Sequence, residues 1–189
     1  LQKPKKVKFY ASNGTSYHYL CKKDEDLRKD MRMMEFATFI NRILTNDRLC
    51  RQKDFRMVTY AVICLNETCG ILEWVENTKS FRKVVGKMLD FRGIKIDYEE
   101  IRKLYIDVER PNKEQIKLKM SNFQNILLKK FPPVLHSWFT CHYKDISSWF
   151  NSRLLYTRSI ALWSMVGYII GLGDRHAENI LLNTKTGSI

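Results

Sequence analysis

The sequence has 189 residues, of which 44% are hydrophobic and 28% charged, and its net charge is +13 at pH 7. This composition allows a sizeable core. The positive charge is dispersed, and its densest run, residues 3–8, is little interleaved with aromatic residues. The charge pattern therefore disfavours direct nucleic-acid readout. The five cysteines form no C-x-x-C pair, which disfavours a zinc site and fits reduced thiols. The longest apolar stretch, Ile160 to Ile170, is too short to cross a bilayer.

The first predicted element is a β-hairpin. Strand-favouring residues at Val7 to Ala11 and Thr15 to Lys22 flank Ser12-Asn13-Gly14, a strong turn signal. Lys22 therefore ends a strand, where its ammonium can reach the phosphates of a nucleotide and needs a carboxylate to hold it. Three carboxylates are candidates for this partner: Glu25, Asp30 and Glu35.

A helix and a second hairpin follow. Helically spaced apolar residues predict a helix from Leu27 to Cys50 that packs against the sheet. The β-branched and aromatic run Phe55 to Leu65, a turn at residues 66–70 and the strand Ile71 to Val75 predict the second hairpin.

The second half is predicted to be helical. Helices are expected at Ser80 to Asp90 after the cap-like Asn77-Thr78, Tyr98 to Glu109, Glu114 to Lys130, Val134 to Tyr143, and Ile146 to Ile170 with Asp145 or Ser147 as its cap. Gly93 and Pro111 mark the expected flexible joints. The apolar end of the last helix is expected to be buried.

A polar loop follows this apolar helix and precedes the short apolar run Ile180 to Leu182. Asp174 and Asn179 are five residues apart, as are the catalytic Asp and the metal-binding Asn of protein kinases, but here a histidine follows the aspartate. Asp174 would orient an acceptor hydroxyl and take its proton, and His176 would hydrogen-bond the phosphoryl group. Asn179 would give a neutral oxygen to Mg²⁺, or to Mn²⁺ in its place.

The loop sequence G-L-G-D-R-H-A-E-N-I-L-L, at residues 171–182, resembles the catalytic loop of the phosphatidylinositol-3-kinase-related protein kinases. Two further regions support the resemblance. The ATP-lysine region of the family is resembled by Tyr19 to Lys22 together with Asp26 to Asp30. The inter-lobe hinge of the family is resembled by Thr59 to Val62 together with Gly70 to Val75. Within the family, Leu1 to Lys6, Leu27 to Asp30 and Met34 to Phe36 are most like the DNA-damage checkpoint branch.

The resemblance implies an α+β, bilobal protein-kinase-like fold. A small antiparallel-sheet lobe would occupy residues 1–75, beginning with the remnant of a phosphate loop, and a partial, mainly helical large lobe residues 76–189. A second metal-binding Asp is expected after the loop and none follows Ile189, so we expect an excerpt that is inactive alone.

The resemblance also implies roles for individual residues. The backbone of Glu73 to Val75 would hydrogen-bond adenine, Trp74 and Leu72 would flank its faces, and Tyr60 would line the inner pocket. The nucleotide-binding residues so implied are Gln2, Lys22, Glu25, Asp30, Tyr60, Leu72, Glu73, Trp74, Val75 and Leu181. The catalytic residues would be Asp174 and His176, with Asn179 as a metal ligand.

The implied activity is ATP-dependent phosphorylation of protein Ser or Thr followed by Gln, in nuclear signalling of DNA damage and replication stress. The resemblance implies a long helical-repeat polypeptide, a dedicated interacting protein bound outside these residues, and only indirect contact with nucleic acid. A phosphoinositide lipid kinase shares the Asp-Arg-His order and is the first alternative. A non-catalytic kinase-shaped scaffold is the second, although Lys22, Asp174 and Asn179 are all present. A basic nucleic-acid-binding module is the third, and steep salt dependence of binding would reveal it.

Overall fold

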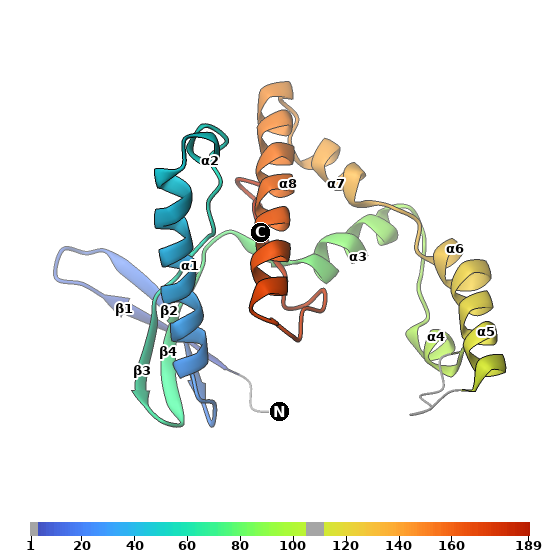
Figure 1. The fold of residues 1–189 in the computed structure, drawn as a ribbon, viewed down its shortest axis with the longest axis horizontal. Coiled ribbons are helices and arrows are strands. Elements are labelled where there is room, and N and C mark those ends of the chain that lie inside the picture. The colour runs from blue at the N-terminus through green and yellow to red at the C-terminus, as the bar shows by residue number, and fades with distance from the viewer. Residues whose placement is uncertain (1–3, 105–111) are drawn as a thin grey trace.

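The computed structural model describes residues 4–104 and 112–189. Figure 1 shows an antiparallel sheet crossed by a long helix, followed by a mainly helical part with a second long helix at its centre. The expected α+β arrangement of a small sheet part and a larger helical part is therefore observed. Gln2, Pro111 and the end of the helix predicted to reach Glu109 lie outside the described residues.

The sheet has four strands in the order β1-β2-β4-β3, and all neighbours are antiparallel. Its strands are β1 Lys5–Tyr10, β2 Ser16–Lys23, β3 Val62–Asn66 and β4 Cys69–Glu73. Both predicted hairpins are confirmed. In the first turn Gly14 has a φ of 79°, in the left-handed region that glycine adopts readily. Lys22 is paired with Gly70 across β2 and β4.

Helix α1, Arg28–Asn46, packs tightly on this sheet. Leu27, just before it, is 1% exposed, and a Cβ added at Gly70 would lie 2.7 Å from Leu27 Cδ1. The helix expected to continue to Cys50 instead breaks at Asp47, which has an extended conformation. Asp47 accepts the Cys50 N–H at 2.8 Å and so caps the separate short helix α2, Arg48–Gln52.

The strand predicted from Phe55 to Leu65 is wrong over its first half, because β3 begins only at Val62. The preceding segment is attached to α1 by a side chain. Asn41 Nδ2 donates to Met57 O at 2.9 Å, and Met57 N donates to Asn41 Oδ1 at 2.8 Å. One amide thus satisfies both backbone groups of a residue that is 0% exposed, so no neighbouring strand is needed there.

The helical part contains six α-helices within the described ranges: α3 Phe81–Phe91, α4 Tyr98–Leu104, α5 Lys113–Asn122, α6 Leu128–Lys130, α7 Leu135–His142 and α8 Ile146–Ile169. A π-helical turn, η1 Phe123–Leu127, joins α5 to α6. Asp145 caps α8 by accepting the Ser148 N–H at 2.8 Å, which was one of two predicted caps. The cap predicted at Asn77-Thr78 is wrong, since Ser80 caps α3 while residues 78–80 form strand β5, Thr78–Ser80.

Two hydrophobic clusters hold these elements together. The larger joins α3 and α7 to the short strand β6, Leu181–Asn183, and its buried residues are Val84, Met88, Leu89, Val134, Trp138, Phe139 and Leu182. The smaller joins α1 to α8 through Ala37, Met57 and Val166. Because α8 leads directly into the polar loop, this second cluster sets the loop's position relative to the sheet.

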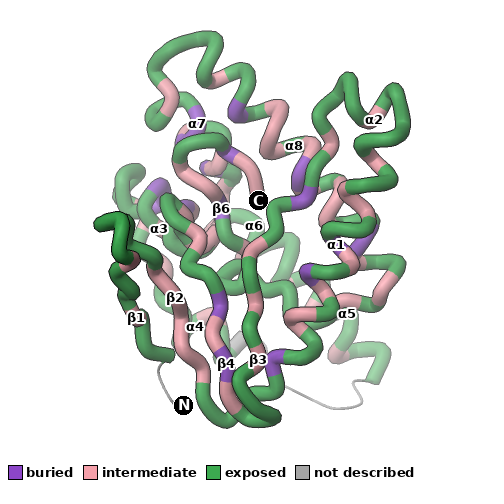
Figure 2. Tube along the Cα trace, turned by 90° about the vertical axis from the view of Figure 1, so that its left-hand side faces the viewer, coloured by how far each residue is buried: buried purple, intermediate pink, exposed green. Residues whose placement is uncertain are grey.

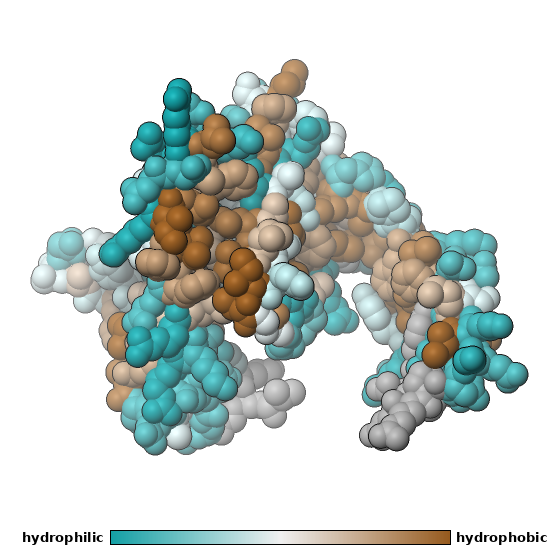
Figure 3. Space-filling model, viewed as in Figure 1, coloured by the Kyte–Doolittle hydropathy of each residue, from teal (hydrophilic) through white to brown (hydrophobic). Residues whose placement is uncertain are grey.

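The apolar end of α8 is less buried than expected. Val166 is 5% exposed, but Met165, Tyr168 and Ile169 are 60%, 85% and 71% exposed. Figure 2 shows that residues classed as exposed occur through much of the chain, and Figure 3 shows hydrophobic side chains gathered where α1 and α8 face the viewer. The prediction that this whole stretch is buried is therefore wrong for the described residues. None of the described helices is long and apolar enough to cross a membrane.

Candidate catalytic and nucleotide-binding site

The loop after α8 brings its three predicted functional side chains together. Asn179 Nδ2 donates to both Asp174 O and Asp174 Oδ2 at 2.9 Å, and His176 Nε2 lies 3.6 Å from Asp174 Oδ1. These donations leave Asn179 Oδ1, a hard neutral oxygen of the kind that Mg²⁺ prefers, as the free end of the amide. Asp174, His176 and Asn179 are all exposed, so a substrate can reach them.

The chain enters the loop through two unusual conformations. Gly171 has a φ of 64° and ends α8, with Leu172 N donating back to Gly167 O at 2.8 Å. Asp174 has a φ of 54°, which costs a non-glycine residue roughly 1 kcal/mol or more. Such a conformation persists where surrounding hydrogen bonds hold the residue in place, as those from Asn179 do here.

The far end of the loop is anchored by β6, which pairs with β5 in antiparallel register. Thr184, just after β6, donates from N and Oγ1 to Asn77 O at 2.7 and 2.9 Å. Asn77 itself has a φ of 59° and lies in the segment that joins the sheet to α3. The loop after α8 and the linker between the two parts are therefore fixed to each other.

On the sheet, Lys22 Nζ donates to Glu25 Oε2 at 2.7 Å, and the lysine side chain is 24% exposed. Of the three candidate partners, the structure thus pairs Lys22 with Glu25. Glu35 is paired with Arg32 at 2.9 Å. The partly exposed ion pair holds the lysine ammonium near the end of the inner strand β2, where it remains accessible to an anion.

The predicted hinge offers one free backbone donor. Glu73 N donates to Ala61 O at 2.8 Å and Trp74 N donates to His18 O at 2.9 Å, so both amides are occupied. Among residues 4–104 and 112–189, the Val75 N–H has no hydrogen-bond partner. Of the backbone amides of Glu73 to Val75 that were expected to bind adenine, only the Val75 N–H is therefore available.

Tyr60 lies near groups from both parts of the chain. Burial raises the pKa of Tyr60, the Asp30 carboxylate adds to the rise, and the Arg175 guanidinium opposes it. Tyr60 thus responds to charges on both α1 and the loop after α8. Tyr60 also lines a cavity of about 510 Å³ together with Met31, Met34, Glu35, Thr38, Phe39, Arg42, Thr59 and Val62.

The remaining predicted nucleotide contacts differ in accessibility. Leu72 is 7% exposed and Trp74 is 36% exposed, with Lys6 Nζ 4.2 Å from the centre of the indole ring. Leu181 is 44% exposed and is paired with Ser80 in β5. Trp74 and Leu181 can therefore be reached from solvent, whereas Leu72 is part of the packed interior of the sheet.

Sequence reasoning missed three residues that hold this site: Asn41, Arg82 and Thr184. Asn41 positions the segment leading to Tyr60, and Thr184 binds the linker. Arg82 Nη1 donates to Glu178 Oε1 in the loop at 3.1 Å, across 96 positions of sequence. No local pattern marks any of them, because each acts through a contact distant in the chain.

Comparison with known proteins identifies the family. The model of the family described as phosphatidylinositol 3- and 4-kinase matches residues 16–189. Protein kinase rad3 of Schizosaccharomyces pombe is 43% identical over 188 residues, which cover 99% of this chain and 8% of that protein. The serine/threonine-protein kinase ATR of Oryza sativa subsp. indica is 42% identical over 192 residues, covering 99% and 7%. The chain thus spans less than a tenth of the length of these relatives.

The fold comparison agrees. The solved structure described as "FAT and kinase domain of CtTel1" has a TM-score of 0.85 and 30% identity, over 98% of this chain and 13% of that one. This similarity confirms the kinase-like fold, and the curated relatives confirm the predicted resemblance. The chain belongs to the phosphatidylinositol 3- and 4-kinase family and is, within it, similar to the related protein kinases of the ATR type.

Proposed function

We propose that this chain forms the nucleotide-binding and catalytic-loop part of an ATP-dependent serine/threonine protein kinase. The observation that carries the proposal is the contact of Asp174 with His176 and Asn179 on one strained, exposed loop. Lys22, held by Glu25, supplies the phosphate-binding cation on the sheet. Groups of these types are what phosphoryl transfer needs from a protein.

Each side chain has a separable task. Asp174 accepts the proton of the acceptor hydroxyl and orients its oxygen, while His176 donates a hydrogen bond to the transferred group. Lys22 binds the nucleotide phosphates and the Val75 N–H binds the adenine ring. Asn179 Oδ1 would hold Mg²⁺ or Mn²⁺, which would supply positive charge to offset that of the nucleotide phosphates.

We further propose that the substrates are proteins with Ser or Thr followed by Gln, and that the kinase acts in nuclear DNA-damage and replication-stress checkpoints. An ATR-interacting protein would bind through regions outside this chain and would connect it indirectly to nucleic acid. The support is the likeness to rad3, ATR and MEC1, the last being 36% identical in Candida albicans over the full chain.

The test uses the longest natural polypeptide that carries residues 1–189, with labelled ATP and a matched pair of Ser-Gln and Ser-Ala peptides. We expect transfer to the Ser-Gln peptide. Asp174→Ala should lower turnover at least about 100-fold with little loss of ATP affinity, because a positioned base supplies that much of the rate. Transfer only to phosphoinositide vesicles would establish a lipid kinase instead. ATP binding without any transfer would support the scaffold.

A further inference from the structure

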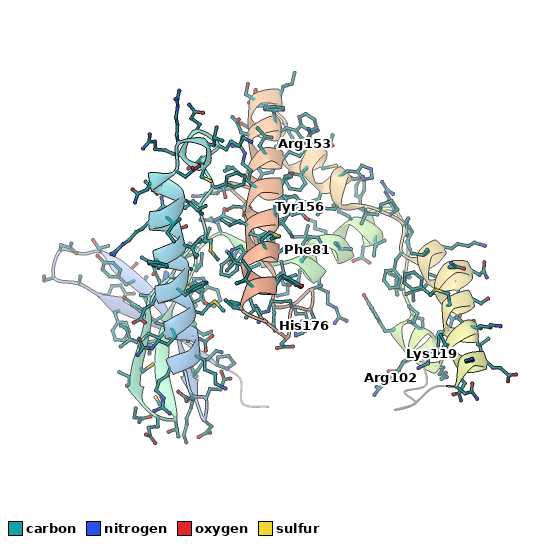
Figure 4. The ribbon with its side chains drawn as sticks, viewed as in Figure 1. Phe81, Arg102, Lys119, Arg153, Tyr156 and His176 are labelled. Carbon is teal, nitrogen blue, oxygen red and sulfur yellow. The ribbon has the colours of Figure 1, made fainter. Side chains whose placement is uncertain are left out.

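The first residues of α3 make backbone hydrogen bonds to the proposed catalytic loop. Phe81 N donates to Ile180 O at 2.8 Å, and Arg82 N donates to Ala177 O at 2.9 Å. Figure 4 labels Phe81 at the beginning of α3 and His176 in the loop below the end of α8. These two bonds fix the loop backbone on the C-terminal side of His176 to the first turn of α3.

The Arg82 side chain adds a second connection at the same place. Its Nη1 donates to Glu178 Oε1 at 3.1 Å, and its guanidinium carbon lies 4.9 Å from the centre of the Tyr98 ring. This distance is within the range of a cation–π interaction. Tyr98 is the first residue of α4, so one guanidinium joins the catalytic loop to the α4–α6 arm, residues 98–104 and 113–130. Arg82, Tyr98 and Glu178 line one open cavity of about 540 Å³.

Glu178 lies between two residues with proposed roles in phosphoryl transfer. Its N–H donates to His176 Nδ1 at 3.1 Å, and the next residue, Asn179, donates its N–H to His176 O at 2.9 Å. A shift of Glu178 therefore moves both the imidazole and the amide that contact Asp174. A Glu178 carboxylate without its arginine would also add negative charge beside a site that receives phosphates.

We propose that Arg82 is a positioning residue for the catalytic loop, which acts through Glu178 and is itself oriented by Tyr98. The inference rests on the proposed kinase function. The side chains of Arg82 and Glu178 are 51% and 58% exposed, and ion pairs so exposed contribute little to fold stability. Loss of Arg82 should therefore appear in the rate of phosphoryl transfer and not in the melting temperature.

The experiment measures kcat and KM for ATP in the longest natural polypeptide that carries the chain. Arg82→Gln should lower kcat about ten- to hundredfold, the size of effect expected from small misplacement of catalytic groups, with KM for ATP nearly unchanged. Arg82→Lys keeps the charge and should recover part of the loss. The double variant Arg82→Gln with Glu178→Gln should recover more, since no unpaired carboxylate remains. Lys87→Gln removes the same charge from the same helix and should have no effect.

The arm is tested separately at Tyr98. Tyr98→Leu removes the ring from the guanidinium and should lower kcat by less than Arg82→Gln does, without adding to the loss when the two are combined. Tyr98→Phe keeps the ring and should retain the wild-type rate. Equal losses in Tyr98→Leu and Tyr98→Phe would overturn the role of the ring.

An unchanged kcat in Arg82→Gln would overturn the inference at Arg82. Additive losses of kcat in the double variant Arg82→Gln with Glu178→Gln would overturn it as well. A second readout does not need catalysis: amide hydrogen exchange of residues 171–180 should be faster in Arg82→Gln than in wild type. If the wild-type protein transfers no phosphate, the proposed function fails, while this exchange difference still supports the claim that Arg82 holds the loop through Glu178. Equal exchange in Arg82→Gln and wild type would overturn that claim.

Discussion

Replacing Asn41 with leucine is the sharpest test of how the sheet part is built. The Asn41 amide makes two hydrogen bonds of 2.8 and 2.9 Å to the backbone of Met57, which is 0% exposed. Leucine is close to asparagine in size but can neither donate nor accept. The substitution therefore leaves a buried N–H and a buried C=O without partners.

Each buried polar group left unpaired costs about 1–3 kcal/mol, so with partial access of water we expect a total loss of about 3 kcal/mol. Leucine has a higher helix propensity than asparagine, so the change in propensity alone would stabilise α1. A loss of stability in Asn41→Leu therefore cannot come from helix propensity. For a chain of this length, the loss corresponds to a fall in melting temperature of about 6 to 12 °C. ATP affinity should fall as well, because Tyr60 follows Met57 by three residues.

Urea denaturation of Asn41→Leu beside the wild type measures the change, which should lower the midpoint without altering the slope. Thr45→Val is the matched control: it removes an exposed hydrogen bond of 2.7 Å to Asn41 O one turn further along α1. We expect the control to stay within about 0.5 kcal/mol of the wild type. A loss below about 1 kcal/mol in Asn41→Leu would refute the reasoning, because two buried unpaired groups cannot cost so little.

Three other variants test the site and the helix that carries it. Lys22→Met should weaken ATP binding about tenfold or more, because it removes a charge-assisted hydrogen bond to phosphate, and Glu25→Gln should weaken it less. Calorimetry measures both affinities. Equal ATP affinities in Lys22→Met and wild type would contradict the role of Lys22 in binding phosphate. Asp145→Ala should destabilise α8 at neutral pH. Hydrogen bonds from Ser148 lower the pKa of Asp145 from its usual 3.8, so its charge stabilises the fold above that pH and this part is lost as pH falls through the lowered value. The stability difference between Asp145→Ala and wild type should shrink in acid melts, and a pH-independent difference would argue against the charged cap.

Local patterns predicted much of this fold. The hairpin at Ser12 to Gly14 follows from turn residues between two strand-forming runs, and the start of α8 follows from its cap at Asp145. The spacing of Asp174 and Asn179 likewise marked both as functional residues of one loop, and the structure shows their side chains in contact. In each of these cases the decisive atoms lie within a few residues of one another.

The errors have a shared physical cause. Phe55 to Val58 have the composition of a strand, but a side chain from α1 takes up the backbone groups of Met57. The run Ile160 to Ile170 is apolar enough for a buried helix, yet α1 covers only the face that contains Val166. Composition reports what a segment tends to form, while its actual partners depend on which other elements pack against it.

The residue order of the chain was sufficient to indicate a kinase loop, a lysine at a strand end and the family to which they belong. The three-dimensional arrangement was needed to select Glu25 as the partner of Lys22, to leave Val75 as the free hinge donor, and to place Arg82 on Glu178. Those assignments depend on contacts whose geometry is set by packing between distant segments. A sequence specifies such contacts only through the whole fold, because their free energy comes from burial and distance and not from any local pattern.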